Sequence, residues 1–314
     1  MSAAGPPLAR TRSAGRGPRT GRRLGGRNQE LLPALLFIAP ALVGFVVFTA
    51  TPAIRGVVLS FTDSTVFDTG EFIGLDNYIE LLSDRVFWNS LGVTAYYVVV
   101  NIGVQMVLAL LIAVLLERLS RSTIMRAIVM TPYMVSNVVA AMVWLWILDT
   151  QMGIFNSFLD VIGLDRINLF GTPEFVIPTL ALINVWRFVG YTALLIFAGL
   201  QTIPNELYEA GRIDGAGEVR MFRSITLPLL RPHLALVLIM TTAGSFQVFD
   251  VVSVTTGGGP ANASNVLQMY IYGLAFEQYE FGHATAVSTV LTIILVTIAI
   301  VQYRVSRAGR SDLT

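Results

Sequence analysis

Six long apolar runs constrain the fold of this 314-residue chain more than any other feature. A helix needs about 20 apolar residues to cross the hydrocarbon core of a bilayer, and every one of these runs reaches that length. The runs cover residues 31–53, 91–116, 127–148, 175–200, 232–255 and 284–303. Backbone polar groups must be paired inside lipid, so such runs are expected to be helical. The sequence therefore predicts an all-α integral membrane protein with six transmembrane helices.

Composition excludes several kinds of site. Charged residues make up 13% of the chain, where a soluble domain carries about 25%. Cysteine is absent, so disulfides and cysteine-ligated metals are excluded. Lysine is also absent, which rules out a Walker A loop for ATP. The two histidines, His233 and His283, offer no paired metal ligands, and no catalytic, cofactor or metal site is expected on this chain.

The arginines are concentrated in alternate connecting segments. Seventeen of the 21 lie in the N-terminal tail, in the connections after the second and fourth runs, and in the C-terminal tail. The positive-inside rule places such segments in the cytoplasm, so both termini are predicted to be cytoplasmic. The tail of residues 1–30 is rich in Gly, Pro and Arg and is expected to be disordered, touching anionic lipid rather than nucleic acid. Residues 31–303 then form one membrane domain, and residues 304–314 form a second cytoplasmic tail.

The first run is long enough to be a retained helix. A cleaved signal peptide has an apolar region of about 7–15 residues and a small-residue cleavage site, and residues 31–53 exceed that length without a clear site. The outer loops, residues 55–89 and 151–174, are too short for a sizeable folded domain. Their aromatic residues either anchor helices at the membrane interface or form a docking surface for an external protein, and both readings remain open.

The connection of residues 201–231 carries an unusual polar stretch. Residues 208–228 read YEAGRIDGAGEVRMFRSITLP, with three acids and three arginines. Pro204 suits the first turn of a short helix, with Glu206 at its positive end. The small or short residues that share one face at helical spacing are Ala210, Gly211, Asp214 and Gly215. Gly217 is expected to end this helix as a C-terminal glycine, so the stretch is either an ordinary glycine-containing loop or a short docking helix for a cytoplasmic partner.

The same stretch resembles a known motif. The residues that carry the resemblance are Glu209, Ala210, Gly211, Asp214, Gly215, Ala216, Ile225, Leu227 and Pro228. They closely resemble the EAA loop that marks the permease subunits of bacterial ATP-binding-cassette (ABC) importers, with Gly211 where alanine is usual. Residues 72–91, 246–260 and 270–286 resemble the carbohydrate-uptake branch of that family, which includes the maltose-type and glycerol-phosphate-type permeases.

The resemblance covers about residues 31–303 and implies the fold, the partners, the location and the coupling residues of the protein. The implied fold is the type I ABC importer permease fold, with a cytoplasmic coupling helix at residues 204–217. The implied partners are a second permease subunit, two ATPase subunits that bind ATP and Mg²⁺, and an external solute-binding protein or lipoprotein. In this picture the chain lies in the bacterial plasma membrane and forms half of a path for a sugar or sugar-like solute. The coupling residues that the resemblance implies are Glu209, Ala210, Gly211, Asp214, Gly215 and Ala216.

A second set of residues is a candidate solute path. Arg187 lies near the middle of the fourth run, where a charge is costly unless it faces a cavity or a partner. It either contacts solute or pairs with Asp250 of the fifth run. Planar polar groups beside aromatic rings suit a sugar, and the candidates of this kind are Asn184, Trp186, Arg187, Tyr191, Gln247 and Asp250.

Other functions were weighed against sugar import. Importers of glycerophosphodiesters or other polar solutes share the same motifs. A secondary transporter would use intramembrane acids and often shows inverted repeats, but only Asp250 fits and no repeat is visible. A membrane scaffold without transport would not need the docking loop.

Overall fold

The structure is a computed structural model and describes residues 27–68, 70–119 and 122–308. Most of the predicted N-terminal tail, and residues 309–314 of the C-terminal tail, lie outside these residues. Residues 27–30, expected to belong to the tail, are already part of the first helix. The chain divides into two compact units, residues 1–54 and 55–314, and each is described by itself.

Helices form all the regular structure of the described residues, apart from one isolated bridge between Thr62 and Phe72. In chain order the elements are α1 (Arg27–Phe45), η1 (Val46–Ala50), α2 (Thr51–Leu59), α3 (Asp76–Ser83), α4 (Arg85–Leu119), α5 (Thr123–Met130), η2 (Thr131–Met134), α6 (Asn137–Ile147), α7 (Ile154–Val161), α8 (Pro173–Leu200), α9 (Asn205–Ile213), α10 (Glu218–Met221), η3 (Phe222–Thr226), α11 (Leu227–Phe246), α12 (Asp250–Thr255), α13 (Leu267–Tyr272), η4 (Gly273–Glu277) and α14 (Phe281–Ala308). The predicted all-α class is confirmed.

Five of the six predicted spans are helical stretches long and apolar enough to cross a membrane. They are Leu36–Leu59, Arg85–Arg118, Pro173–Leu200, Glu218–Thr255 and Phe281–Ser306. The third, predicted as one run over residues 127–148, is instead a pair of shorter helical stretches, Thr123–Met134 and Asn137–Ile147, bent by 87°. The prediction of six spans holds only if this bent pair is counted as one.

The bend in the third span has a local cause. Pro132 lies in η2 and has no N–H for a helical hydrogen bond. Val135 and Ser136 then take extended conformations, with ψ near 136° and 145°. Ser136 stands at the N-cap position of α6, and its carbonyl accepts from the N–H of Ala140 at 2.9 Å. The sequence therefore ends one helix and begins another inside a single apolar run.

The fifth span is also interrupted. Helix α11 ends at Phe246 and α12 begins at Asp250, with Phe249 at φ −140° and ψ −58° between them. Helix α12 packs on α6. Two interrupted spans therefore meet in the second unit.

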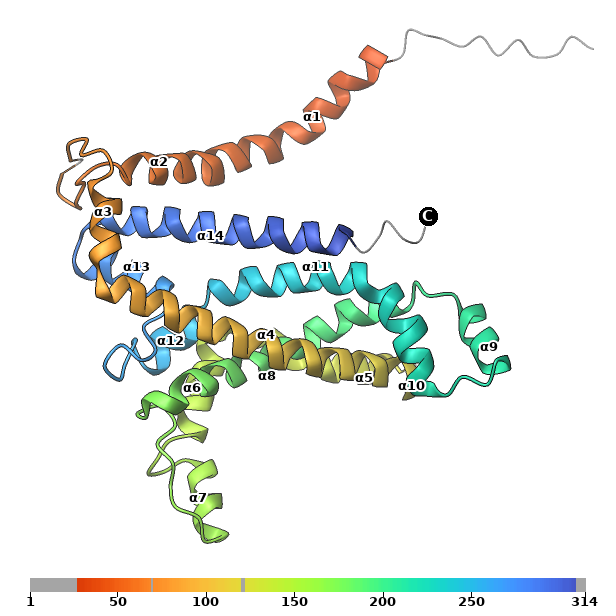
Figure 1. Cartoon of the computed structure of the whole chain (residues 1–314). Coiled ribbons are helices and arrows are strands. Elements are labelled where there is room, and N and C mark those ends of the chain that lie inside the picture. The colour runs from red at the N-terminus through yellow and green to blue at the C-terminus, as the bar shows by residue number, and fades with distance from the viewer. Residues whose placement is uncertain (1–26, 69, 120–121, 309–314) are drawn as a thin grey trace, which may run out of the picture. The chain divides into compact units, whose positions relative to one another are not determined.

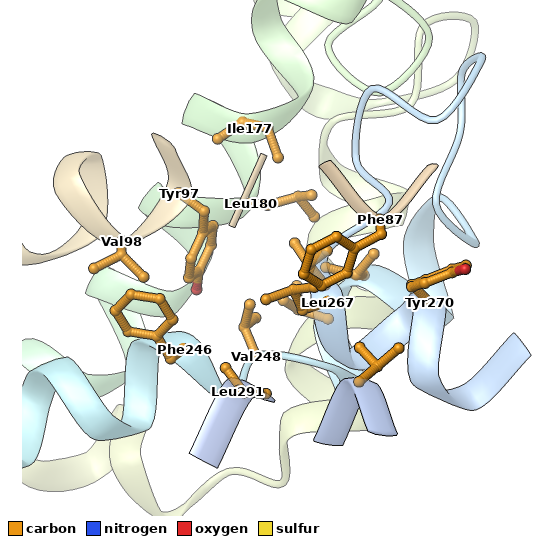
Figure 2. Close-up of a cluster of buried hydrophobic side chains, with 14 of the residues drawn as sticks. Phe87, Tyr97, Val98, Ile177, Leu180, Phe246, Val248, Leu267, Tyr270 and Leu291 are labelled. Carbon is orange, nitrogen blue, oxygen red and sulfur yellow. The ribbon is translucent and has the colours of Figure 1, made fainter. Parts of the chain in front are cut away.

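The core of the second unit is built around α4 and α8, which make its most extensive helix–helix contact. One buried cluster joins these helices to the end of α11 and to α13 and α14, and Figure 2 shows Tyr97, Leu180, Phe246 and Leu267 converging within it. A second cluster joins α4, α8 and α11 around Ala113, Ile196 and Leu230. Gly190 of α8 admits α5, because a Cβ there would overlap the carbonyl oxygen of Val129.

The two predicted outer loops contain short helices that the sequence analysis did not foresee. In the first, buried Asn77 of α3 donates to the carbonyls of Ser60 and Thr62 at 3.0 and 2.9 Å. In the second, Asp149 accepts from the backbone N–H groups of Met152 and Gln151, and these bonds lower the pKa of its carboxyl group. Buried side chains and local hydrogen bonds thus organise both loops.

Candidate functional site

The loop between α8 and α11 contains the helix that the sequence predicted. Helix α9 begins at Asn205 with Pro204 at its N-cap, and Figure 1 shows it standing apart from α4, α8, α11 and α14. The hydroxyl of Tyr208 lies 2.9 Å from Oγ1 of Thr226, which anchors α9 to the chain just before α11. The predicted bounds, residues 204–217, were too wide at the C-terminal end.

The end of α9 corrects the sequence prediction. The helix stops at Ile213, and the N–H of Ala216 donates to the carbonyl of Gly211 at 2.9 Å. The N–H of Gly215 donates to the carbonyl of Arg212 at 3.0 Å, and Gly215 has φ +72°. These two bonds form a Schellman motif, which needs a residue in the left-handed region. Gly215 is therefore the terminating glycine, whereas Gly217 has φ −71° and needs no glycine for its conformation.

The small residues of α9 do not all face outward. A Cβ at Gly211 would lie 3.3 Å from Cδ1 of Ile225 and 3.5 Å from Cγ of Met221, so Gly211 lets the loop pack on itself. Ala210, Asp214 and Gly215 are exposed. The largest exposed apolar side chains of α9 are Ile213 and Leu207, at 87% and 41% exposure. The outward surface of α9 and its C-terminal turn thus combines small residues with these two apolar side chains.

A polar groove of about 530 Å³ runs beside α9. Its charged lining residues are Glu117, Arg118, Glu209, Arg212 and Glu218. Nη1 of Arg118 lies 2.7 Å from Oε2 of Glu218, and both side chains are about half exposed, so this pair contributes only about 0–1 kcal/mol. The groove places Glu209 among charged groups at the C-terminal end of α4.

The candidate solute path contains a small cavity between α4, α8 and α11. Its volume is about 140 Å³. The lining residues are Gln105, Asn184, Phe188, Tyr191, Thr192, Leu195, Met240, Thr241, Gly244 and Ser245. Of the six predicted path residues, Asn184 and Tyr191 line this cavity.

A buried hydrogen-bond network surrounds the cavity. Nδ2 of Asn184 donates to Oδ1 of Asn101 at 3.0 Å, and Nδ2 of Asn101 donates to Oγ of Ser245 at 2.8 Å. Nε2 of Gln105 donates to Oγ1 of Thr192 at 2.7 Å. The sequence analysis missed Asn101 and Gln105, although two amides four residues apart in an apolar run are a usable signal for one polar helix face.

Trp186 and Gln247, two of the predicted path residues, lie outside the lining of this cavity. The ring of Trp186 stands edge-on to Trp144 with centroids 5.5 Å apart. Gln247 is exposed and follows the last residue of α11, with its N–H on the carbonyl of Gly244. Neither lines the cavity.

Arg187 and Asp250 do not pair with each other. Among the residues that the structure describes, no ion pair joins them. Nε of Arg187 donates to the carbonyl of Val135 at 2.7 Å, and Oδ2 of Asp250 accepts from Nδ2 of Asn137 at 2.6 Å. The pairing considered from sequence is therefore replaced by two contacts to the bend of the third span.

Comparison with known proteins agrees with this architecture. Residues 105–309 match the family described as binding-protein-dependent transport system inner membrane component. The chain is 36% identical to the trehalose/maltose transport system permease protein MalF of Thermococcus litoralis, over 90% of this chain and 97% of that one. It is 34% identical to the sn-glycerol-3-phosphate transport system permease protein UgpA of Agrobacterium fabrum, over 88% and 94%.

The fold has a counterpart among solved structures. It matches a chain in the crystal structure of a bacterial ABC transporter involved in the import of the acidic polysaccharide alginate, with a TM-score of 0.79 and 24% identity. The match covers 90% of this chain and 97% of that chain, and it confirms the predicted permease fold. The chain therefore belongs to the family of binding-protein-dependent transport system inner membrane components, as a multi-pass permease subunit of an ABC importer.

Proposed function

We propose that this permease forms half of the translocation path for an uncharged sugar or sugar-like solute. The observation that carries the proposal is the cavity between α4, α8 and α11. Its lining includes the amides of Asn184 and Gln105, the hydroxyls of Thr192 and Ser245, and Tyr191. Part of the hydrogen-bonding capacity of these amides and hydroxyls is already used within the fold. Amides and hydroxyls both donate and accept hydrogen bonds, which matches the alternating donors and acceptors of a sugar.

The charge of the side chains that line the cavity helps to choose between a sugar and a glycerophosphodiester as the solute. Within the described part of the chain, no charged side chain lines it. A phosphodiester is recognised best by arginine or lysine, so this half of the path favours a neutral solute over a glycerophosphodiester. The relative named for trehalose/maltose supports a neutral sugar. The relative named for sulfoquinovosyl glycerol supports a sugar group but not the absence of charge, because that solute carries a sulfonate.

The coupling part of the proposal concerns α9. Its outward surface, with exposed Ala210, Asp214 and Ile213, is the side offered to a cytoplasmic ATPase. ATP and Mg²⁺ are bound by two such ATPase subunits, and a second permease completes the path. The arginine-rich segments orient the chain with both termini and α9 in the cytoplasm.

The test is solute uptake into proteoliposomes that contain the whole complex with its binding protein. A panel of labelled neutral saccharides and glycerophosphodiesters is offered, and uptake of a saccharide is expected. Asn184→Leu should reduce that uptake by about 5- to 150-fold, because leaving a hydrogen-bonding group without its partner costs about 1–3 kcal/mol. Thr289→Val is the matched control, because the hydroxyl of Thr289 donates to the carbonyl of Thr285 within its own helix. Selective uptake of phosphodiesters, or normal uptake by Asn184→Leu, would contradict the proposal.

A further inference from the structure

The bend in the third span creates a demand for hydrogen-bond donors. In a straight helix the carbonyl of Tyr133 would pair with the N–H of Asn137, four residues on. The extended conformations of Val135 and Ser136 remove that pairing. Backbone carbonyls without partners are strongly unfavourable inside a membrane, so the bend persists only if another group supplies donors.

Arg187 supplies these donors from the middle of α8. Its Nε donates to the carbonyl of Val135 at 2.7 Å and its Nη2 to the carbonyl of Tyr133 at 3.3 Å. The guanidinium lies 4.5 Å from the centroid of Phe188 and 5.6 Å from that of Tyr133. A planar group with five N–H donors suits two neighbouring carbonyls and can stack on rings at the same time. The guanidinium of Arg187 thus stabilises the N-terminal side of the bend.

Asp250 acts on the other side of the bend. Its Oδ2 accepts from Nδ2 of Asn137, the first residue of α6, at 2.6 Å. A carboxylate beside the first turn of a helix is also favoured by the positive end of the helix dipole. Because α12 packs on α6, this contact ties the interrupted fifth span to the bent third span.

The bend reaches the cavity through two stacked rings. Tyr133 and Tyr191 have centroids 4.6 Å apart and planes inclined by 12°, and Tyr191 lines the cavity. We propose that Arg187 and Asp250 are positioning residues that fix the bend from opposite sides. The ring of Tyr133, held at the bend, then fixes the position of the Tyr191 ring on which it stacks. This inference rests on the proposed function, which makes the cavity part of the solute path.

The absence of cysteine from the sequence makes the bend directly measurable. Spin labels are placed through Ile124→Cys in α5 and Met142→Cys in α6, on side chains that are 71% and 57% exposed. The distance between the labels is measured in the purified complex. Arg187→Gln should shift or broaden the distance distribution, and Asp250→Asn should do so to a smaller extent, because asparagine keeps an acceptor for Asn137.

The matched control is Arg166→Gln. Arg166 also donates to two backbone carbonyls, those of Thr150 and Gln151, but it lies in an exposed outer loop. This variant should leave the distance distribution unchanged. If Arg187→Gln fails to assemble, Arg187→Lys keeps the charge but lacks the planar fork and should broaden the distribution. The double variant Arg187→Gln with Asp250→Asn should be no closer to wild type than Arg187→Gln alone, because the two charges hold separate contacts.

Variants of Tyr133 test whether the bend is linked to the cavity. Tyr133→Phe should keep both uptake and the distance distribution, whereas Tyr133→Leu should lose uptake while the bend stays in place. An unchanged distance distribution in both Arg187 variants would overturn the role assigned to Arg187. Recovery of the wild-type distribution in the double variant would instead favour an ion pair between Arg187 and Asp250. Normal uptake by Tyr133→Leu would overturn the link between the bend and Tyr191. Failure of the proposed solute path is distinguishable, because it appears as normal uptake by Asn184→Leu with the bend undisturbed.

Discussion

Replacing Gly215 with alanine should loosen the end of α9 without filling any occupied space. A Cβ at Gly215 would meet nothing within 4 Å, and the same is true two residues later at Gly217. The two glycines differ in backbone conformation: Gly215 has φ +72° and Gly217 has φ −71°. Comparing the same substitution at Gly215 and at Gly217 therefore distinguishes the effect of the backbone conformation from the effect of the added side-chain volume.

The magnitude follows from the left-handed conformation. An L-residue with a Cβ pays about 1–2 kcal/mol to occupy that region, which corresponds to a factor of about 5–30 in an equilibrium constant. Gly215→Ala should therefore raise the hydrogen-exchange rate of the Ala216 amide by about that factor, because this amide closes the Schellman motif on Gly211. Gly217→Ala should leave the rate unchanged. Gly215→Asn should recover part of the protection, because asparagine tolerates the left-handed region.

The same variants test docking on the ATPase. Asparagine at position 215 tolerates the left-handed conformation but adds bulk to the exposed surface. If a small surface is needed, Gly215→Asn should lose co-purification of the ATPase although its amide protection is partly recovered, and Gly215→Leu should lose both. Equal exchange rates in Gly215→Ala and Gly217→Ala would refute the reasoning about the helix terminus. Retained ATPase and solute-stimulated hydrolysis in Gly215→Leu would refute the docking role.

Three further outcomes are expected. Gly190→Ala should lower the thermal midpoint of the complex by forcing Cβ against the carbonyl oxygen of Val129, at a cost of about 1–3 kcal/mol, whereas Gly103→Ala, which has open space, should not. Asn101→Ala should destabilise the complex by about 1–3 kcal/mol in denaturant unfolding, because it removes the hydrogen bonds that the buried Asn101 side chain makes to Asn184 and Ser245. The folded-state pKa of Asp149 is depressed, so its stabilisation is present above the ordinary aspartate value of about 3.9 and is lost as pH falls through the lower folded value. The difference in thermal midpoint between wild type and Asp149→Asn should accordingly disappear at low pH.

The sequence by itself determined the class of the protein and the position of the helix-containing loop between the fourth and fifth spans. Both depend on information that is local along the chain. The length of an apolar run decides whether a helix can cross a bilayer, and the spacing from Glu209 to Pro228 identifies the loop within one short stretch. Part of the cavity lining was also predictable, because Asn184 and Tyr191 lie seven residues apart and share a helix face.

Only the tertiary structure decided which groups meet. Arg187 and Asp250 are both costly charges, so pairing them was a reasonable hypothesis, but their partners are at a bend whose donors and acceptors appear only when the third span is interrupted. The choice of Gly215 over Gly217 as the helix terminus depends on which amides reach back to Gly211 and Arg212. The contacts of Arg187 and Asp250 join segments that are far apart in the sequence, and hydrophobicity and spacing along the chain do not specify them. The hydrogen bonds at Gly215 are local, but they depend on backbone dihedral angles that the sequence pattern leaves open between the two glycines.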